Sequence, residues 1–248
     1  MGRVRGLTVA RDGLTQIAIV LMAVGAYELA RKMMVPDWGR AFDNARAVFD
    51  LERVAGFAWE HSLQAAFLGV PDLVQAMNVF YFVGHFLFTG IFFFWLYHRS
   101  REGFRLFRNA FLVATALSVF VHWQFPTAPP RLANVGLEDT LMALSGIDIG
   151  SPHSSALSNP VAAVPSLHAA YALGVGIGVV VYGRWLALRI AGALYPPAVV
   201  LTTIVTGNHF LFDAIAGWLV LGIGFLAAWL FERARRRDAG RAQHACLT

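Results

Sequence analysis

Six long apolar runs limit what this chain can fold into more than any other feature. They cover residues 14–34, 73–97, 106–125, 166–182, 186–205 and 210–231, and each is close to the roughly 20 residues that a helix needs to cross a bilayer. Of the 248 residues, 57% are hydrophobic and 14% charged, whereas a soluble domain carries about 25% charged residues. We therefore predict an all-α polytopic membrane protein, with six transmembrane helices in a single domain over residues 1–248. The first run is too long for a cleaved signal-peptide core, and we expect it to be retained.

Arginine-rich connections orient the predicted spans. They lie between spans two and three, between spans four and five and after span six, and comprise Arg99, Arg101, Arg105, Arg108, Arg184, Arg189, Arg233, Arg235, Arg236, Arg237 and Arg241. Because short cytoplasmic connections are enriched in Lys and Arg, we expect these ends and both termini to be cytoplasmic. Residues 36–72 contain three Arg and six acids, and residues 126–164 contain Arg131 as their only Lys or Arg. Both segments are therefore expected on the outer side of the membrane. Arg31 and Lys32, at the outer end of span one, run against this orientation.

The cations are arginines except for Lys32. This bias is typical of a GC-rich genome and suggests a multi-pass protein of a bacterial inner (plasma) membrane. The cations lie between apolar runs and share no face, which argues against a nucleic-acid partner. The single cysteine, Cys246, excludes a disulfide within the chain and a cysteine-based metal site.

The outer segment 36–72 has the pattern of a helix in the membrane interface. Phe42, Ala45, Val48 and Phe49 recur at helical spacing, with acids and arginines between them. Such an amphipathic segment can serve as a surface cap or as a lid over a lipid entrance.

Three polar motifs stand at the outer ends of the predicted spans. Residues 124–131 (QFPTAPPR) end span three, residues 165–168 (PSLH) open span four, and residues 207–213 (GNHFLFD) open span six. The predicted topology brings all three to one side of the membrane.

The third motif has a histidine and an acid at helical spacing. His209 and Asp213 are four residues apart, so on a helix the carboxylate can accept a hydrogen bond from one ring nitrogen. The other nitrogen is then available as a metal ligand or as a nucleophile. Taken alone, the pair is equally compatible with helix packing.

The other two motifs supply complementary groups for phosphoryl chemistry. The free amides beside Pro165 and the Ser166 hydroxyl suit an anion, and His168 can protonate a departing alkoxide. Arg131 can bind a phosphate in bidentate fashion. The alternatives are an ordinary helix start with a capping serine, and an arginine anchored near lipid headgroups.

Together these motifs resemble the type 2 phosphatidic acid phosphatase superfamily, and most closely its inositol phosphorylceramide synthase-like (inositolphosphotransferase) branch. The resemblance runs from span two onward and is closest over residues 159–171 (NPVAAVPSLHAAY). It implies that His209 forms a phosphoenzyme, that Asp213 orients it and that His168 is the general acid and base. It further implies that Arg131 and Ser166 hold phosphate oxygens without a metal or cofactor.

The chain departs from the family pattern at cationic positions. Gln124 replaces the lysine of the first motif, with Leu132 at its proline; Leu167 replaces the glycine of the second; and Thr202 and Thr203 replace the Ser-Arg of the third. A phosphomonoester carries close to two negative charges near neutral pH and a phosphodiester only one, so a site with fewer cations suits a diester. Arg40, Arg46 or Arg53 from the outer segment can restore this charge.

We therefore predict a phosphotransferase that moves a phospholipid headgroup phosphate to a lipid or polyol alcohol. The alternatives are a phosphatase for a lipid phosphate or polyprenyl diphosphate and, as a non-enzyme, a transporter or scaffold. The residues expected to contact substrate are Arg131, Ser166, Leu167, Gln124, Asn208, Tyr81 and His85. Tyr81 and His85 share a stripe of span two with Asn78, where helix packing is an equal alternative. His122 and His153 are further candidates, and the oligomeric state is left open.

Overall fold

The computed structural model describes residues 2–146, 148 and 160–245, and the chain divides into two compact units, residues 1–35 and 36–248. The first unit consists of α1 (Gly2–Met33). Its segment Asp12–Met33 is long and apolar enough to cross a membrane. Near its end the Arg31 guanidinium pairs with the carboxylate of Glu28 at 2.6 Å, so the first of the two cations that oppose the predicted orientation is paired within its own helix.

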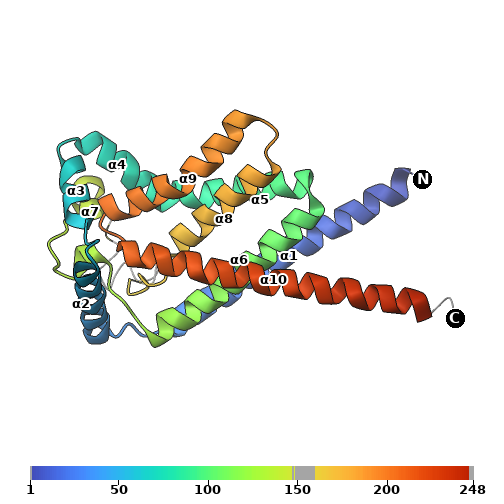
Figure 1. Cartoon of the computed structure of the whole chain (residues 1–248), viewed down its shortest axis with the longest axis horizontal. Coiled ribbons are helices and arrows are strands. Elements are labelled where there is room, and N and C mark those ends of the chain that lie inside the picture. Colours follow the sequence, from blue (N-terminus) through green and yellow to red (C-terminus); the bar gives the residue numbers. More distant parts are fainter. Residues whose placement is uncertain (1, 147, 149–159, 246–248) are drawn as a thin grey trace. The chain divides into compact units, whose positions relative to one another are not determined.

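The second unit is helical throughout its described part apart from connecting loops and one isolated β-bridge. It contains α2 (Trp38–Ala55), α3 (Glu60–Leu68), α4 (Pro71–Val79), the π-helical turn η1 (Phe80–Gly84), α5 (His85–Arg99), α6 (Arg101–Gln124), the 3-10 turn η2 (Pro130–Leu132), α7 (Thr140–Ser145), α8 (Leu167–Tyr182), α9 (Leu186–Val205) and α10 (Leu211–Ala245). Figure 1 shows α5, α6, α8, α9 and α10 packed as a bundle, with α2, α3 and α7 at one end.

Five of the six apolar runs form helices long and apolar enough to span a membrane. They are Asp12–Met33, Pro71–Arg99, Arg101–Gln124, Leu186–Val205 and Leu211–Asp238. The fourth run forms α8, which is apolar but has only 16 residues. The protein is therefore a multi-pass membrane protein, with five candidate spans and one shorter apolar helix.

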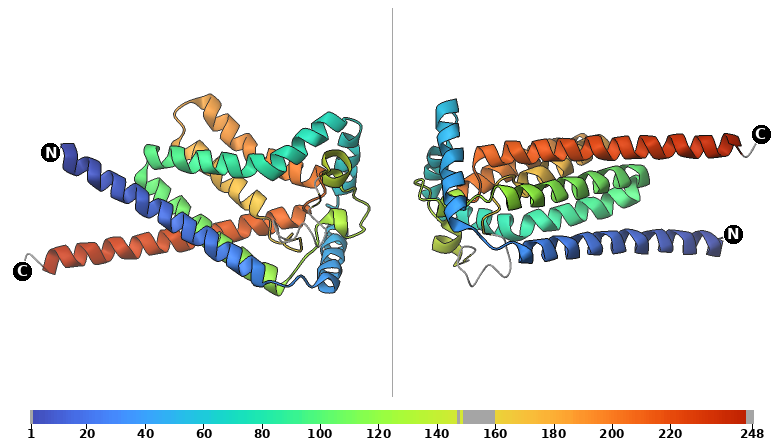
Figure 2. Two further views of the ribbon diagram at one scale, coloured as in Figure 1. Left: turned by 180° about the vertical axis from the view of Figure 1, so that it is seen from behind. Right: turned by 90° about the horizontal axis from the view of Figure 1, so that it is seen from below.

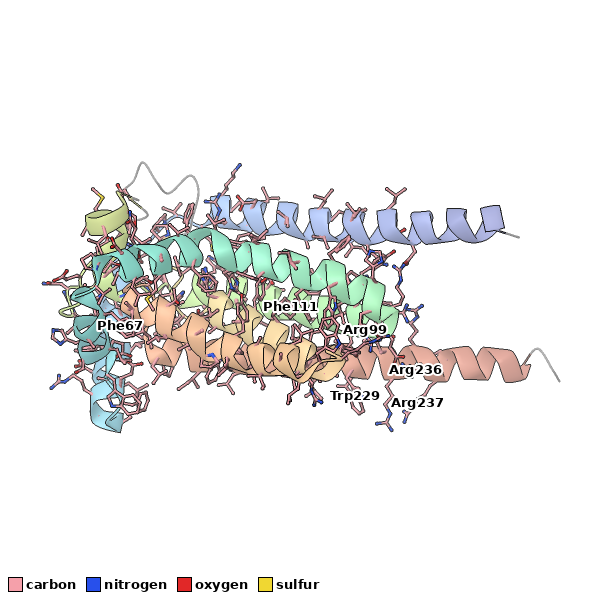
Figure 3. All side chains as sticks on the ribbon, turned by 90° about the horizontal axis from the view of Figure 1, so that it is seen from above. Phe67, Arg99, Phe111, Trp229, Arg236 and Arg237 are labelled. Atoms are coloured by element: carbon pink, nitrogen blue, oxygen red, sulfur yellow. The ribbon has the colours of Figure 1, made fainter. Side chains whose placement is uncertain are left out.

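The arginine-rich connections meet at one end of the bundle. Arg99 Nε, at the end of α5, donates to the Tyr182 carbonyl at the end of α8. Arg236 of α10 pairs with Glu102 at the start of α6. Figure 3 shows Arg99, Arg236 and Arg237 near this end and Phe67 of α3 at the other. Arg99, Arg236 and Arg237, three of the cations that were expected to share a side, therefore lie at one end of the bundle.

The outer segment forms two helices that lie across the opposite end of the bundle (Figure 2). In α2 the buried stripe consists of Ala41, Ala45, Val48 and Glu52. Its apolar members pack with Ala128, Ala133, Val161, Val164 and Phe210. The stripe of this predicted interfacial segment is therefore buried against loops of the protein itself.

Two glycines of α10 allow the helix to approach its neighbours closely. A Cβ at Gly217 would lie 2.3 Å from the Ser166 carbonyl oxygen, and one at Gly224 would lie 2.3 Å from that of Ala110. Any larger side chain would clash with these backbones. The contact at Gly217 holds α10 against the start of α8, where two of the sequence motifs meet.

Candidate active site

Backbone hydrogen bonds join the three polar motifs in one place. Thr127, after α6, pairs with the segment before α8, through Thr127 N to Val161 O at 2.8 Å and Ala163 N to Thr127 O at 3.0 Å. Arg131 N donates to Gly207 O, and Ser166 N donates to Asp213 O, both at 2.9 Å. The main chain alone therefore brings residues 124–131, 165–168 and 207–213 together.

His209 is buried and held at one ring nitrogen. Its Nδ1 lies 3.1 Å from the Ala163 carbonyl oxygen and 3.2 Å from Asp213 Oδ2. Both partners are acceptors, so Nδ1 carries the proton and Nε2 keeps its lone pair. The same Asp213 oxygen accepts the N–H of Phe210 at 2.9 Å. This is the geometry that a histidine nucleophile needs.

His168, in the first turn of α8, lies beside His209. Their ring centroids are 5.7 Å apart. The Nε2 of His168 is buried without a hydrogen-bond partner, and its ring hydrogen-bonds the backbone of Tyr81. A buried imidazole with one unused nitrogen next to a nucleophile can donate or accept a proton during the reaction.

The π-helical turn η1 and the first residue of α5 place two aromatic side chains against His168. The ring of Tyr81 stacks on that of His168 at 4.3 Å between centroids, and the ring of His85 lies 4.6 Å away. His85 is almost fully buried, and its Nδ1 has no partner. The ring centroid of Tyr81 also lies 6.4 Å from that of His209. π-Helical turns within α-helices occur frequently at functional sites.

Arg131 is buried and already paired. Its Nε donates to Asn208 Oδ1 at 3.0 Å, and its Nη1 donates to Asp139 Oδ2 at 2.7 Å. Asn208 in turn donates to the Thr206 hydroxyl at 2.8 Å. Asp139 also caps α7 by accepting the N–H of Met142. Arg131 is thus fixed beside the residue that precedes His209, and its charge is balanced by a carboxylate.

The segment that opens α8 is held from two sides. The Ser166 hydroxyl accepts the N–H of Ala169 at 3.2 Å and caps the helix. His122 Nε2 lies 3.1 Å from the Pro165 carbonyl, which makes His122 a donor to this loop. Leu167 and His168 follow the cap, where helical N–H groups have no preceding carbonyl to bind. These two amides remain suited to an anion.

Other predicted residues lie elsewhere. Gln124 is exposed at the end of α6, and its carbonyl accepts the exposed Arg40 at 2.9 Å. Arg46 and Arg53 are exposed and paired with Asp43 and Asp50, acids of the same helix. His153 and Asn159 lie outside the described residues. Among the described residues no three His, Cys, Asp or Glu side chains form a group that could hold a metal.

Three buried polar residues of the outer helices were not predicted to reach this site. Glu52 Oε1 accepts the N–H of Phe212 at 2.6 Å, and Glu60 Oε1 accepts that of Leu211 at 2.9 Å. Gln64 binds the loop after η2 and the end of α9, through the carbonyls of Glu138 and Val205. One sequence signal was available: Glu52 continues the helical stripe of Ala41, Ala45 and Val48.

The family comparison agrees with this geometry. The profile of the PAP2 superfamily matches residues 46–227, a range that contains the three motifs and both histidines. The chain belongs to the PAP2 superfamily. Searches of curated proteins and of solved structures found no significant match. The match begins within α2, so the PAP2 region includes part of the outer segment as well as the bundle.

Superfamily membership supports a membrane enzyme with phosphatase or phosphotransferase activity. At the positions where the PAP2 resemblance expects Ser-Arg, Thr202 and Thr203 are buried, and their hydroxyls donate to the carbonyls of Ala198 and Val200 in the same helix. Among the described residues the buried arginines are Arg31 of α1 and Arg131. Relative to the family motifs, the site is therefore poor in positive charge.

Proposed function

We propose that the protein is a phosphotransferase that moves the headgroup phosphate of a phospholipid to an alcohol acceptor, as in the inositolphosphotransferase branch of its superfamily. The observation that carries the proposal is the ion pair between Arg131 and Asp139. The one arginine at the motif position is neutralised, and Thr203 is neutral where the family has a second arginine. A monoanionic phosphodiester is easier to hold in such a site than a dianionic phosphomonoester.

The reaction has two displacements at phosphorus. In the first, His209 Nε2 attacks, the bond to the diacylglycerol oxygen breaks, and His168 gives that oxygen a proton. In the second, the acceptor hydroxyl gives its proton to His168 and attacks the phosphohistidine, which releases His209. Each step leaves both histidines ready for the next, which is the advantage of covalent catalysis.

Several contacts support these roles. The acceptors around Nδ1 of His209 leave Nε2 for attack, and the unpartnered Nε2 of His168 suits proton transfer. We assign Arg131, Asn208, Ser166 and the Leu167 amide to phosphate binding, because Arg131 donates to Asn208, next to His209 in the chain, and the Ser166 N–H donates to the Asp213 carbonyl. Tyr81 and His85 contact His168, so we assign them to the acceptor side of the site, whereas the exposed Gln124 has no assigned contact.

The arginine-rich end of the bundle supports an active site on the extracytoplasmic face. Arginine-rich connections favour the cytoplasm, and the three motifs lie at the opposite ends of the helices that carry them. We propose that the enzyme acts in a bacterial inner membrane on a lipid donor and a lipid or polyol acceptor. Its superfamily equally supports the alternative of a lipid phosphate or polyprenyl diphosphate phosphatase with the same residues.

A labelled-headgroup assay separates the two activities. Purified protein in lipid is given phosphatidylinositol labelled in the headgroup, together with candidate alcohols, and a lipid phosphomonoester in a parallel reaction. We expect the label to appear in a new phospholipid without release of inorganic phosphate. Rapid phosphate release from the monoester, with no label transfer, would overturn the transferase in favour of the phosphatase. The matched control is His209→Ala, which must be inactive in both reactions.

A further inference from the structure

The first turn of α10 is held by carboxyl groups from three different helices. Phe210 N–H donates to Asp213, Leu211 N–H to Glu60 of α3, and Phe212 N–H to Glu52 of α2. The first amides of a helix have no partner within it and are usually left to water, a cap or an anion. In this protein the outer segment occupies two of them.

Glu52 and Glu60 form a buried acid pair. Their exposed fractions are 0% and 1%, and a protonated Glu52 can donate a hydrogen bond to Glu60. Each Oε2 is buried and accepts no hydrogen bond. Two ionised carboxylates in this position would repel each other in a medium that screens poorly, so burial beside Glu60 favours the protonated form of Glu52.

The charged environment strengthens this preference. Burial, and then a hydrogen bond that protonated Glu52 donates to Glu60, raises the pKa of Glu52 to about 9. The titratable groups that face the pair are the two glutamates themselves, from α2 and α3, and Asp213 from α10, with His209 beyond it. The third carboxylate adds to the cost of ionising both glutamates.

The Glu52–Glu60 pair binds the turn between His209, the proposed nucleophile, and Asp213, which orients it. Leu211 and Phe212 are between His209 and Asp213 in the chain, and their amides set where the backbone of this turn lies. The Asp213 oxygen that binds His209 also binds Phe210 N–H. A shift of the turn would therefore move the carboxylate and the imidazole relative to each other.

From these contacts we propose that Glu52 and Glu60 are positioning residues for the nucleophile. By binding the first turn of α10, they fix the geometry of Asp213 and His209 and join the outer helices to the reaction centre. The proposal rests on the proposed function only in that His209 is the nucleophile, a role that transfer and phosphatase reactions share.

Glu52→Ala and Glu52→Gln test the proposal together. The alanine removes the acceptor for Phe212, and we expect kcat to fall about 10- to 100-fold with KM changed less than threefold. The glutamine can accept from Phe212 and donate to Glu60 as the protonated acid does, so it should recover most of the lost activity. Wild-type activity should also fall above a pH of about 9, and Glu52→Gln should lack this fall. The matched control on the exposed face of the same helix is Asp50→Asn, expected to match the wild type.

A second measurement separates positioning from a merely structural role. In protein labelled with ¹⁵N-histidine, the His209 signal, assigned with His209→Ala, should show a proton on Nδ1 in the wild type and in Glu52→Gln. In Glu52→Ala it should broaden or shift. Activity within threefold of wild type in Glu52→Ala, or lost activity with an unchanged His209 signal, would overturn the proposal.

Two further comparisons cover the case in which a variant does not fold and the case in which no label is transferred. If Glu52→Ala does not fold, as judged by size-exclusion chromatography, the pH profiles of Glu52→Gln and Glu60→Gln decide: profiles that keep the wild-type alkaline fall would overturn the proposal. If the wild type releases phosphate and transfers no label, the transferase proposal fails, and the same variants are compared on phosphate release, which still tests the glutamates.

Discussion

The two ends of the 36–248 bundle carry charge in opposite ways. At the arginine-rich end, charged side chains are exposed. Examples are Arg236 of α10 and Glu102 of α6, with about two thirds of each side chain accessible. At the other end Arg131, Asp213, Glu52 and Glu60 are buried, and each has a defined hydrogen-bond partner. The exposed charges at the first end are suited to orienting the protein in the membrane, and the buried charges at the second end are suited to catalysis.

A few charged groups are enough for a functional site when each one is held by a hydrogen-bond partner. Exposed ion pairs contribute about 0–1 kcal/mol, whereas removing one partner of a buried pair leaves the other unsatisfied at a cost of about 3–5 kcal/mol. The buried end should therefore respond strongly to single substitutions, and the exposed end hardly at all.

His209→Ala should have the largest effect. It removes the attacking nitrogen, so we expect transfer and any phosphate release to fall by at least about 10³-fold, with the fold retained. Label transfer by the purified variant, with circular dichroism as the folding control, measures this. Full activity in the variant would show that the buried end has a structural role only.

His168→Ala should reduce kcat by about 10²- to 10⁴-fold, the usual contribution of a general acid or base. Because the leaving alkoxide loses its proton donor, a donor lipid with a more acidic leaving alcohol should recover part of the rate. Single-turnover measurements with both donors check this. An equal loss for both donors would contradict the acid role of His168.

Asp139→Asn should change specificity more than rate. It removes the charge that balances Arg131, so the rate on a phosphomonoester relative to a phosphodiester should rise about tenfold, which corresponds to about 1.4 kcal/mol. The ratio of kcat/KM values for the two substrates is the measurement, and Asp43→Asn in α2 is the exposed control. An unchanged ratio would remove the charge argument for a diester substrate.

Glu52→Gln should change how stability depends on pH. The pKa of Glu52 is raised from 4.5 to about 9 by burial and by Glu60, so the folded protein binds this proton more tightly than the unfolded chain. Its contribution to stability is complete below about pH 4.5 and is lost progressively as the pH rises through about 9. Tm measured between pH 5 and 9 should fall more in the wild type than in Glu52→Gln. Parallel curves would contradict a protonated Glu52 in the folded protein.

Glu102→Gln should have the smallest effect. It breaks the exposed pair with Arg236 at the arginine-rich end, and we expect less than about 0.5 kcal/mol in stability and transfer within threefold of wild type. Thermal unfolding and the labelled-headgroup assay check both values. A loss comparable to that of Asp139→Asn would break the contrast between the two ends.

The sequence predicts helices better than it predicts the site. The fifth predicted span has the bounds of α9, a mostly apolar run that includes Arg189. The sixth was expected to end near residue 231, whereas α10 continues to Ala245 because the arginines after the apolar run are themselves good helix formers. The hydrogen bond between His209 and Asp213 was predicted and is present, but its predicted basis, helical spacing, is wrong: His209 lies before α10 begins at Leu211, so the bond joins the preceding loop to the first turn of the helix.

Long-range pairing is what the sequence does not reveal. Asp139 lies in a loop, and nothing local indicates that it pairs with Arg131. Glu52 continues the buried stripe of α2, but nothing local indicates that Glu52 or Glu60 binds the start of α10. Their role depends on a contact between residues more than 150 positions apart in the chain, which periodicity cannot specify.

The short length of α8 determines how deep in the membrane the reacting groups lie. Its last residue, Tyr182, is held at the arginine-rich end by Arg99, and 16 residues at 1.5 Å each span about 24 Å. The hydrocarbon core is about 30 Å thick, so Ser166 and His168 should lie several ångströms below the outer water boundary. Bilayer thickness then becomes a control on the enzyme. Thinner membranes should admit more water to the phosphohistidine and favour hydrolysis, and thicker ones should favour transfer to an alcohol.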